Sequence, residues 1–131
     1  MSNPSRLRST LALAAVLFAG ATIAQAPTIK RTPLQRVDIG NNMEVILGIA
    51  EIAPGGSTGR HSHFGVETGY ILGGVGTLEI AGQPTRTLKE GESYLIPAGT
   101  VHDAKATGKE ASKVLAVYVV EKGKPLATPA K

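Results

Sequence analysis

The stretch GGSTGRHSHFGVETGYILGG, residues 55–74, holds two of the three histidines of the chain, His61 and His63. A glutamate, Glu67, follows four residues after the second histidine. On a β-strand, residues i and i+2 lie on the same face about 7 Å apart, so the two imidazoles can reach one ion. Gly65 permits a turn that folds the Glu67 carboxylate back towards them. Two neutral imidazoles and one carboxylate are a donor set typical of divalent first-row metals that keep open coordination positions.

The third histidine, His102, follows the segment IPAGTV at the end of another expected strand. An antiparallel barrel can bring that strand beside His61 and His63. A His-x-His pair alone is weak evidence for a metal, because exposed histidines are common, and a lone glutamate is more often a solvated surface charge. All three histidines, however, fall where one barrel wall can supply ligands. We therefore predict a metal site.

Short apolar runs, separated by glycine and proline, surround these residues. Six runs each predict a strand: MEVILGIAEI, VETGYILGG, GVGTLEIAG, TRTLK, SYLIPAG and SKVLAVYVVEK. The pair Gly73-Gly74 predicts a hairpin between the second and third runs. Beyond the N-terminal segment, no window places apolar residues at the period of a helix. The pattern predicts an all-β protein, an antiparallel sandwich or barrel.

The composition limits the classes of protein to consider. A chain of 131 residues is long enough for a single domain with one modest core. It contains no cysteine, which excludes disulfides, thiolate ligands and a cysteine nucleophile. The formal net charge is +4, but the lysines are scattered and no aromatic residues are interleaved with them. We therefore expect no nucleic-acid partner.

The N-terminus, residues 1–24, predicts a signal peptide. Two arginines and no acidic residue precede an apolar run, residues 11–24, that ends in small side chains. The run is too short and too rich in alanine and glycine to span a bilayer comfortably, and an uncleaved membrane anchor is the alternative. Cleavage can follow Ala21, Ala24 or Ala26. We expect a periplasmic or secreted protein with no stable membrane association after cleavage.

Three further segments complete the predicted organisation. Residues 25–40 include QAPTIKRTPL, which contains proline and shows no apolar pattern, so we expect a flexible lead-in. Residues 41–121 carry the predicted strands and form the barrel. Residues 122–131 are rich in proline and lysine, and we expect them to be a disordered tail.

The spacing of these residues resembles the cupin superfamily. Its first motif is Gly, five residues, His-x-His, three or four residues, Glu, six residues, Gly, and it is met by Gly55, His61, His63, Glu67 and Gly74. Its second motif is Gly, five residues, Pro-x-Gly, two residues, His, three residues, Asn, and it is met by Gly91, Pro97, Gly99 and His102, with Ala106 in place of the asparagine.

This resemblance implies a double-stranded β-helix, also called a jelly roll or cupin barrel, of the type found in small single-domain bacterial cupins. It implies that His61, His63, Glu67 and His102 are the ligands of one divalent transition metal: Fe, Mn, Ni, Cu or Zn. The expected partner is a small-molecule substrate or ligand. A homodimer formed through the outer sheet is a further expectation.

Cupins include dioxygenases, lyases, isomerases and decarboxylases as well as sugar-binding and storage proteins, so the fold leaves the function open. We expect a small-molecule oxidoreductase, dioxygenase-like or quercetinase-like, in which Glu67 is both a ligand and the catalytic base. A non-catalytic metal-dependent binding or sensing protein is the alternative. A third interpretation, a stable shell with vestigial ligands, is disfavoured because all four ligand types are retained.

Few other acid–base groups are available. Tyr70 and Tyr94 are candidates, although tyrosine more often packs within a sheet. Asp103 follows His102 directly, so on a strand it is expected to face away from the metal. Arg60 likewise is expected to point away from the histidines, as a surface charge.

Overall fold

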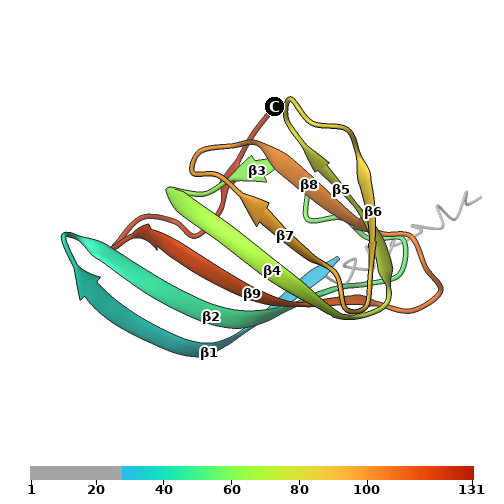
Figure 1. The fold of residues 1–131 in the computed structure, drawn as a ribbon, viewed down its shortest axis with the longest axis horizontal. Coiled ribbons are helices and arrows are strands. Elements are labelled where there is room, and N and C mark those ends of the chain that lie inside the picture. Colours follow the sequence, from blue (N-terminus) through green and yellow to red (C-terminus); the bar gives the residue numbers. More distant parts are fainter. Residues whose placement is uncertain (1–27) are drawn as a thin grey trace, which may run out of the picture.

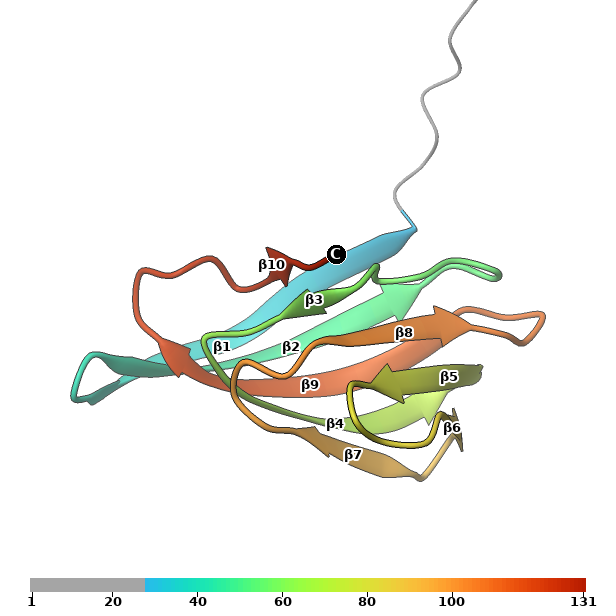
Figure 2. The same ribbon diagram turned by 90° about the horizontal axis from the view of Figure 1, so that it is seen from above.

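The computed structural model describes residues 28–131, so the predicted signal peptide and its cleavage positions lie outside the described residues. The described chain forms two packed β-sheets (Figure 1; Figure 2). Its strands are β1 (Ile29–Gly40), β2 (Met43–Ile52), β3 (His61–Ser62), β4 (Gly65–Gly73), β5 (Val75–Ile80), β6 (Arg86–Lys89), β7 (Ser93–Ile96), β8 (His102–Ala106), β9 (Ser112–Glu121) and β10 (Thr128–Pro129). Within residues 28–131 there is no helix long and apolar enough to cross a membrane.

Each sheet has five strands, and all paired strands are antiparallel. The first sheet has the order β1-β2-β9-β4-β7 and the second the order β10-β3-β8-β5-β6. The chain passes repeatedly from one sheet to the other after β2, as in a jelly roll (Figure 2). The predicted fold, an all-β cupin-type jelly roll in a single domain, is confirmed.

The hairpin predicted at Gly73-Gly74 is wrong. β4 pairs with β7 and β9, whereas β5 pairs with β6 and β8, so the chain changes sheets at this point. Gly74 has a φ of 76°, and a Cβ atom there would lie 2.3 Å from the carbonyl oxygen of Ala111. Only glycine fits this corner. A glycine pair between two apolar runs serves a sheet-crossing corner as well as a hairpin, so the sequence pattern does not separate the two.

The segment expected to be a flexible lead-in is mostly a strand. β1 pairs with β2 along its length, across a turn in which Asn41 and Asn42 have φ angles of 52° and 59°. Positive φ at both central residues is the requirement of a tight type I′ hairpin turn. β1 is an edge strand, where Pro33 is tolerated because one side of the strand needs no ladder partner. The strand was not predicted because its sequence is polar and contains proline.

The tail expected to be disordered is also ordered. β10 pairs with β3, and the N–H of Ala130 donates to the carbonyl of Arg60 at 2.9 Å. Leu126 packs against the hydrophobic core. One apolar residue and a few backbone hydrogen bonds therefore hold residues 122–131 against the barrel, although their composition resembles that of a free terminus.

The hydrophobic core lies between the two sheets. Burial alternates along β9 with the period of two expected for a strand that has one face inward. The core side chains come from both sheets: Ile46, Ile71, Leu78, Ile80, Leu88, Ile96, Val114, Ala116, Tyr118 and Val120. Burial of each large apolar side chain stabilises the fold by about 1.5–3 kcal/mol. This packing gives the barrel a rigid interior in which polar side chains can be held.

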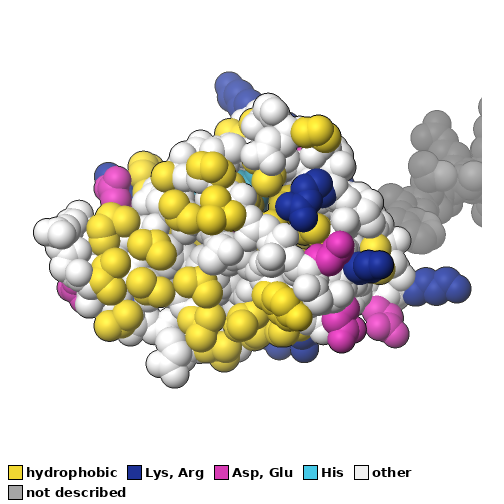
Figure 3. Space-filling model, viewed as in Figure 1, with side chains coloured by type: hydrophobic (Ala, Val, Ile, Leu, Met, Phe, Trp, Pro, Cys, Tyr) yellow, Lys and Arg dark blue, Asp and Glu magenta, His cyan; other side chains and the backbone are white. Residues whose placement is uncertain are grey.

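The outer face of the first sheet is apolar as well. On this face β2 and β9 place three apolar pairs opposite one another: Val45 and Val119, Leu47 and Val117, and Ile49 and Leu115. Figure 3 shows hydrophobic side chains gathered over this sheet. A homodimer through the outer sheet stays a prediction.

Candidate metal centre

The four predicted ligands come from separate parts of the chain and meet inside the barrel. His61 begins β3, His63 follows β3, Glu67 lies in β4 and His102 begins β8. His61 and His102 are direct partners in the β3–β8 ladder. One ligand atom from each residue lies within 4.8 Å of those of the other three, and all four residues are buried. This cluster can hold one metal ion.

Each imidazole is oriented by a hydrogen bond to a backbone carbonyl. The Nδ1 atoms of His61 and His102 donate to the carbonyls two residues earlier in the chain, at 2.7 Å and 2.9 Å. The Nδ1 atom of His63 donates to the carbonyl of Leu126, in the C-terminal segment. Because a carbonyl only accepts, these bonds place the proton on Nδ1 and leave Nε2 free to ligate.

The ligand atoms that face one another fit a cation. His63 Nε2 lies 2.7 Å from Glu67 Oε2, and His102 Nε2 lies 3.2 Å from the same oxygen. With the protons on Nδ1, the lone pairs of the two Nε2 atoms face those of Glu67 Oε2. These three atoms are buried and lack a hydrogen-bond partner. Buried polar atoms almost always have a partner, and a cation at their centre would supply it. Three imidazoles and one carboxylate are a donor set for a divalent transition metal.

The surroundings favour the charge states that ligation requires. Burial raises the pKa of Glu67, whereas the hydrogen bond that its carboxylate accepts from the Tyr94 hydroxyl lowers it. Burial lowers the pKa of His61, and the neighbouring imidazoles act in the same direction against the hydrogen bond to the carbonyl of Gly59. An anionic carboxylate and a neutral imidazole are the forms that bind a metal.

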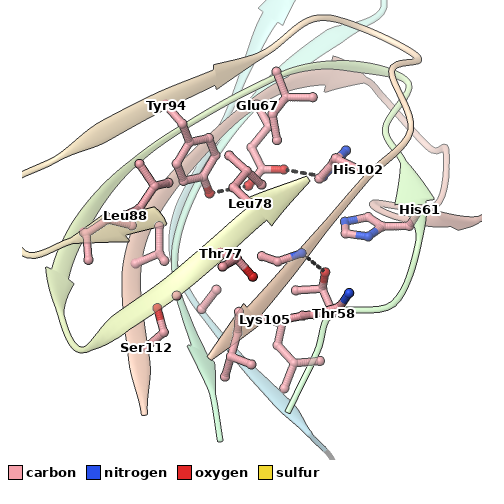
Figure 4. Close-up of a pocket in the computed structure, with 18 of the residues that line it drawn as sticks. Thr58, His61, Glu67, Thr77, Leu78, Leu88, Tyr94, His102, Lys105 and Ser112 are labelled. Carbon is pink, nitrogen blue, oxygen red and sulfur yellow. Dashed lines mark hydrogen bonds and ion pairs between the residues drawn. The ribbon is translucent and has the colours of Figure 1, made fainter. Parts of the chain in front are cut away.

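Tyr94, which the sequence predicted mainly to pack within a sheet, contacts the cluster directly. Its hydroxyl donates to Glu67 Oε1 at 2.7 Å (Figure 4). The tyrosine ring lies against Gly69, where a Cβ atom would come within 2.4 Å of it. Burial and the charge of Glu67 raise the pKa of Tyr94 well above its usual value, so the hydroxyl stays protonated. Tyr94 therefore orients the Glu67 carboxylate, whereas Tyr70 is 48% exposed.

Two further expectations concerned residues next to the ligands. The Asp103 carboxylate accepts hydrogen bonds from Ser57 Oγ at 2.7 Å and Thr58 Oγ1 at 3.1 Å, and it is not part of the metal cluster. It ties the loop before His61 to β8. Arg60 is exposed, and its Nε donates to the carbonyl oxygen of the last residue at 3.2 Å. Both residues therefore face away from the cluster, as predicted.

A cavity of about 40 Å³ adjoins the cluster. Three of the four ligands line it, His61, Glu67 and His102, and its walls are mostly apolar (Figure 4). A second cavity of about 220 Å³ lies between β1, β2, β9 and Leu126. The two cavities share Arg31, Ala50 and Tyr118. A buried water needs roughly 10–15 Å³ of such volume, so the first cavity accepts a group of only a few atoms beside the cluster.

A family model and a curated protein both match this sequence. A model of the cupin domain matches residues 48–118, which include all four ligands. The chain is 31% identical over 123 residues to Germin-like protein subfamily 2 member 2 of Arabidopsis thaliana, an alignment that covers 90% of this chain and 50% of that protein. The chain thus spans about half the length of the curated relative it matches.

Solved structures share the fold. A recombinant oxalate oxidase in complex with glycolate has a TM-score of 0.64 at 21% identity, over 80% of this chain and 56% of that chain. A conserved protein of unknown function from Streptococcus pyogenes has a TM-score of 0.58 at 27% identity, over 76% of this chain and 80% of that chain. At 21% identity, the first likeness shows the fold alone. The model of the cupin domain matches more than half of the chain, and the residues of both motifs lie in one jelly roll. This protein therefore belongs to the cupin family.

Proposed function

We propose that this cupin is an exported metal-dependent oxidoreductase, dioxygenase-like, that acts on small molecules. The observation that carries the proposal is the convergence of three imidazoles and one carboxylate at a cavity. His61, Glu67 and His102 line that cavity, so a molecule inside it lies beside the cluster. Export rests on the predicted signal peptide, residues 1–24.

A divalent metal held by these four side chains would supply Lewis-acid or dioxygen-activating chemistry at the end of the cavity. Glu67 is the only carboxylate among the residues that line this cavity. In the proposal it is both a ligand and the base that accepts a substrate proton. Tyr94 holds Oε1, which leaves Oε2 directed at the cluster. The apolar walls limit access of water to the reacting end.

The size of the cavities favours a small substrate. Sites that enclose drug-sized ligands have volumes of about 300–1,000 Å³, and the two cavities measure about 40 and 220 Å³. A flavonol, the substrate class of a quercetinase-like enzyme, would have to occupy both. Small acids and diketones fit more readily, and we propose them ahead of flavonols.

One observation favours the alternative, a metal-dependent binding or sensing protein. Apart from the metal ligands, few side chains that line the cavity are able to transfer protons near neutral pH. Tyr94 keeps its proton because its pKa is raised, and Lys105 is tied to Glu79 at 2.8 Å. Catalysis would therefore depend on Glu67 and the metal alone.

Oxygen consumption distinguishes the two functions. Protein loaded in turn with Fe(II), Mn(II), Ni(II), Cu(II) and Zn(II) would be screened against small acids, diketones and flavonols, with the His63→Ala variant as a metal-free control. An oxidoreductase consumes oxygen with at least one metal and one substrate, and the control does not. Tight binding of a ligand with no turnover for any metal would establish the binding protein instead.

A further inference from the structure

Arg31 of β1 connects the metal cluster to the second cavity. It lines the smaller cavity together with His61, Glu67 and His102, and it also lines the larger cavity beside Leu126. Its pairing with Ala50, whose side chain packs against the core, places it on the inner side of the first sheet. Arg31 is exposed to solvent, so it lies at the rim of the cavities, where a molecule that enters from the larger cavity would meet it.

The charge of Arg31 is not neutralised by a neighbour. Within residues 28–131 it forms no ion pair, whereas Arg36 on the same strand lies 3.4 Å from Glu44 and Lys30 lies 3.8 Å from Glu51. The other two cations of β1 thus have carboxylate partners, and the one that borders both cavities has none.

Arg31 faces the same two cavities as Tyr118, a buried residue of β9. Tyr118 is shared by both cavities and packs edge-on against the His63 ring, with centroids 5.1 Å apart. An anion between Arg31 and the cluster would therefore lie between two positive groups, the guanidinium and the metal.

We propose that Arg31 binds the carboxylate of a small carboxylic-acid substrate and directs its other end to the metal cluster. The inference rests on the proposed metal site. A guanidinium presents two parallel N–H donors that match the two oxygens of a carboxylate, and such charge-assisted pairs are stronger than neutral hydrogen bonds. The volume beside the cluster restricts the reacting end to a few atoms, such as the hydroxyl or keto group of a short hydroxy or keto acid.

Calorimetric titration tests this role without requiring turnover. The mature chain loaded with Mn(II) would be titrated with glycolate and with glycolamide, its neutral counterpart. The Arg31→Gln variant should bind glycolate about 10- to 100-fold more weakly, as expected when a charge-assisted pair of hydrogen bonds is lost, and should bind glycolamide as the unmodified protein does. Arg31→Lys, which keeps the charge but not the paired donors, should fall between them.

The matched control is Arg36→Gln, which removes a cation from the same strand and the same larger cavity but one that already has a carboxylate partner. It should change glycolate affinity less than twofold. Metal content of every variant would be measured, and equal loading is expected.

Several results would overturn the assignment: equal glycolate affinity for Arg31→Gln and the unmodified protein, an equal loss in Arg36→Gln, or no preference of the unmodified protein for glycolate over glycolamide. Failure of the proposed oxidoreductase function is a different result. Glycolate binding would then depend on Arg31 as described, but no substrate would support oxygen consumption.

Discussion

His63 Nε2 and Glu67 Oε2 lie 2.7 Å apart inside the barrel, although the hydrogen bond from His63 Nδ1 to a backbone carbonyl leaves neither atom a proton to share. Two buried acceptors at this distance repel each other unless a cation lies between them. The same oxygen lies 3.2 Å from His102 Nε2. The geometry of the cluster is therefore one that could hold a metal ion.

Tyr94→Phe tests whether the tyrosine hydroxyl orients the Glu67 carboxylate. The variant loses the 2.7 Å hydrogen bond to Oε1 but keeps the ring that packs against Gly69. We expect metal affinity to fall about tenfold, the lower end of the range for loss of a partner to a metal ligand. Competition with a metal-binding dye would measure the change. Tyr70→Phe alters an exposed tyrosine of the same sheet and should leave the affinity unchanged; an equal effect of both variants would contradict the proposed role.

Glu67→Gln separates metal binding from catalysis. The amide keeps an oxygen ligand but loses the negative charge and the capacity to accept a proton. We expect turnover to fall on the order of 100-fold, as for removal of a general base, with a smaller loss of bound metal. Parallel measurement of metal content and oxygen consumption would show the split. A variant that retains full turnover would rule out Glu67 as the base.

Removal of residues 124–131 tests the contribution of the C-terminal segment. The truncated chain lacks the Leu126 carbonyl that accepts a hydrogen bond from His63 Nδ1, as well as the β10–β3 pairing. We expect metal affinity to fall by about 10- to 100-fold. Leu126→Ala retains the backbone carbonyl and is expected to change the affinity less than threefold. If the truncated protein binds metal as tightly as the full chain, the carbonyl does not position His63.

Export can be checked on protein recovered from the periplasm or the medium of the cells that produce it. Mass spectrometry should find a chain that lacks residues 1–24 or a segment ending near them. An intact Met1 on exported protein would support the uncleaved membrane anchor instead.

The sequence was informative where the physical requirement was local. The His61-x-His63 spacing follows from strand geometry, and the full set of four ligands followed from the resemblance to the two cupin motifs. The central strands β2 and β9 were predictable because they are apolar runs with β-branched residues. β1 was not, because an edge strand tolerates polar residues and proline; the Asn41-Asn42 turn, with positive φ at both residues, was the available signal. The groups that hydrogen-bond the ligands could not be predicted either, because the Leu126 carbonyl and the Tyr94 hydroxyl are brought to them only by tertiary packing.

The central claim is that one metal ion is held by His61, His63, Glu67 and His102. Elemental analysis of protein purified without added metal or chelator, carried out beside the His102→Ala variant, tests it most directly. We predict close to one divalent transition metal per chain in the unmodified protein and a loss of most of it in the variant, because three remaining ligands hold the ion poorly. Absence of metal from the unmodified protein even after incubation with these ions, or equal metal in the variant, would contradict the account.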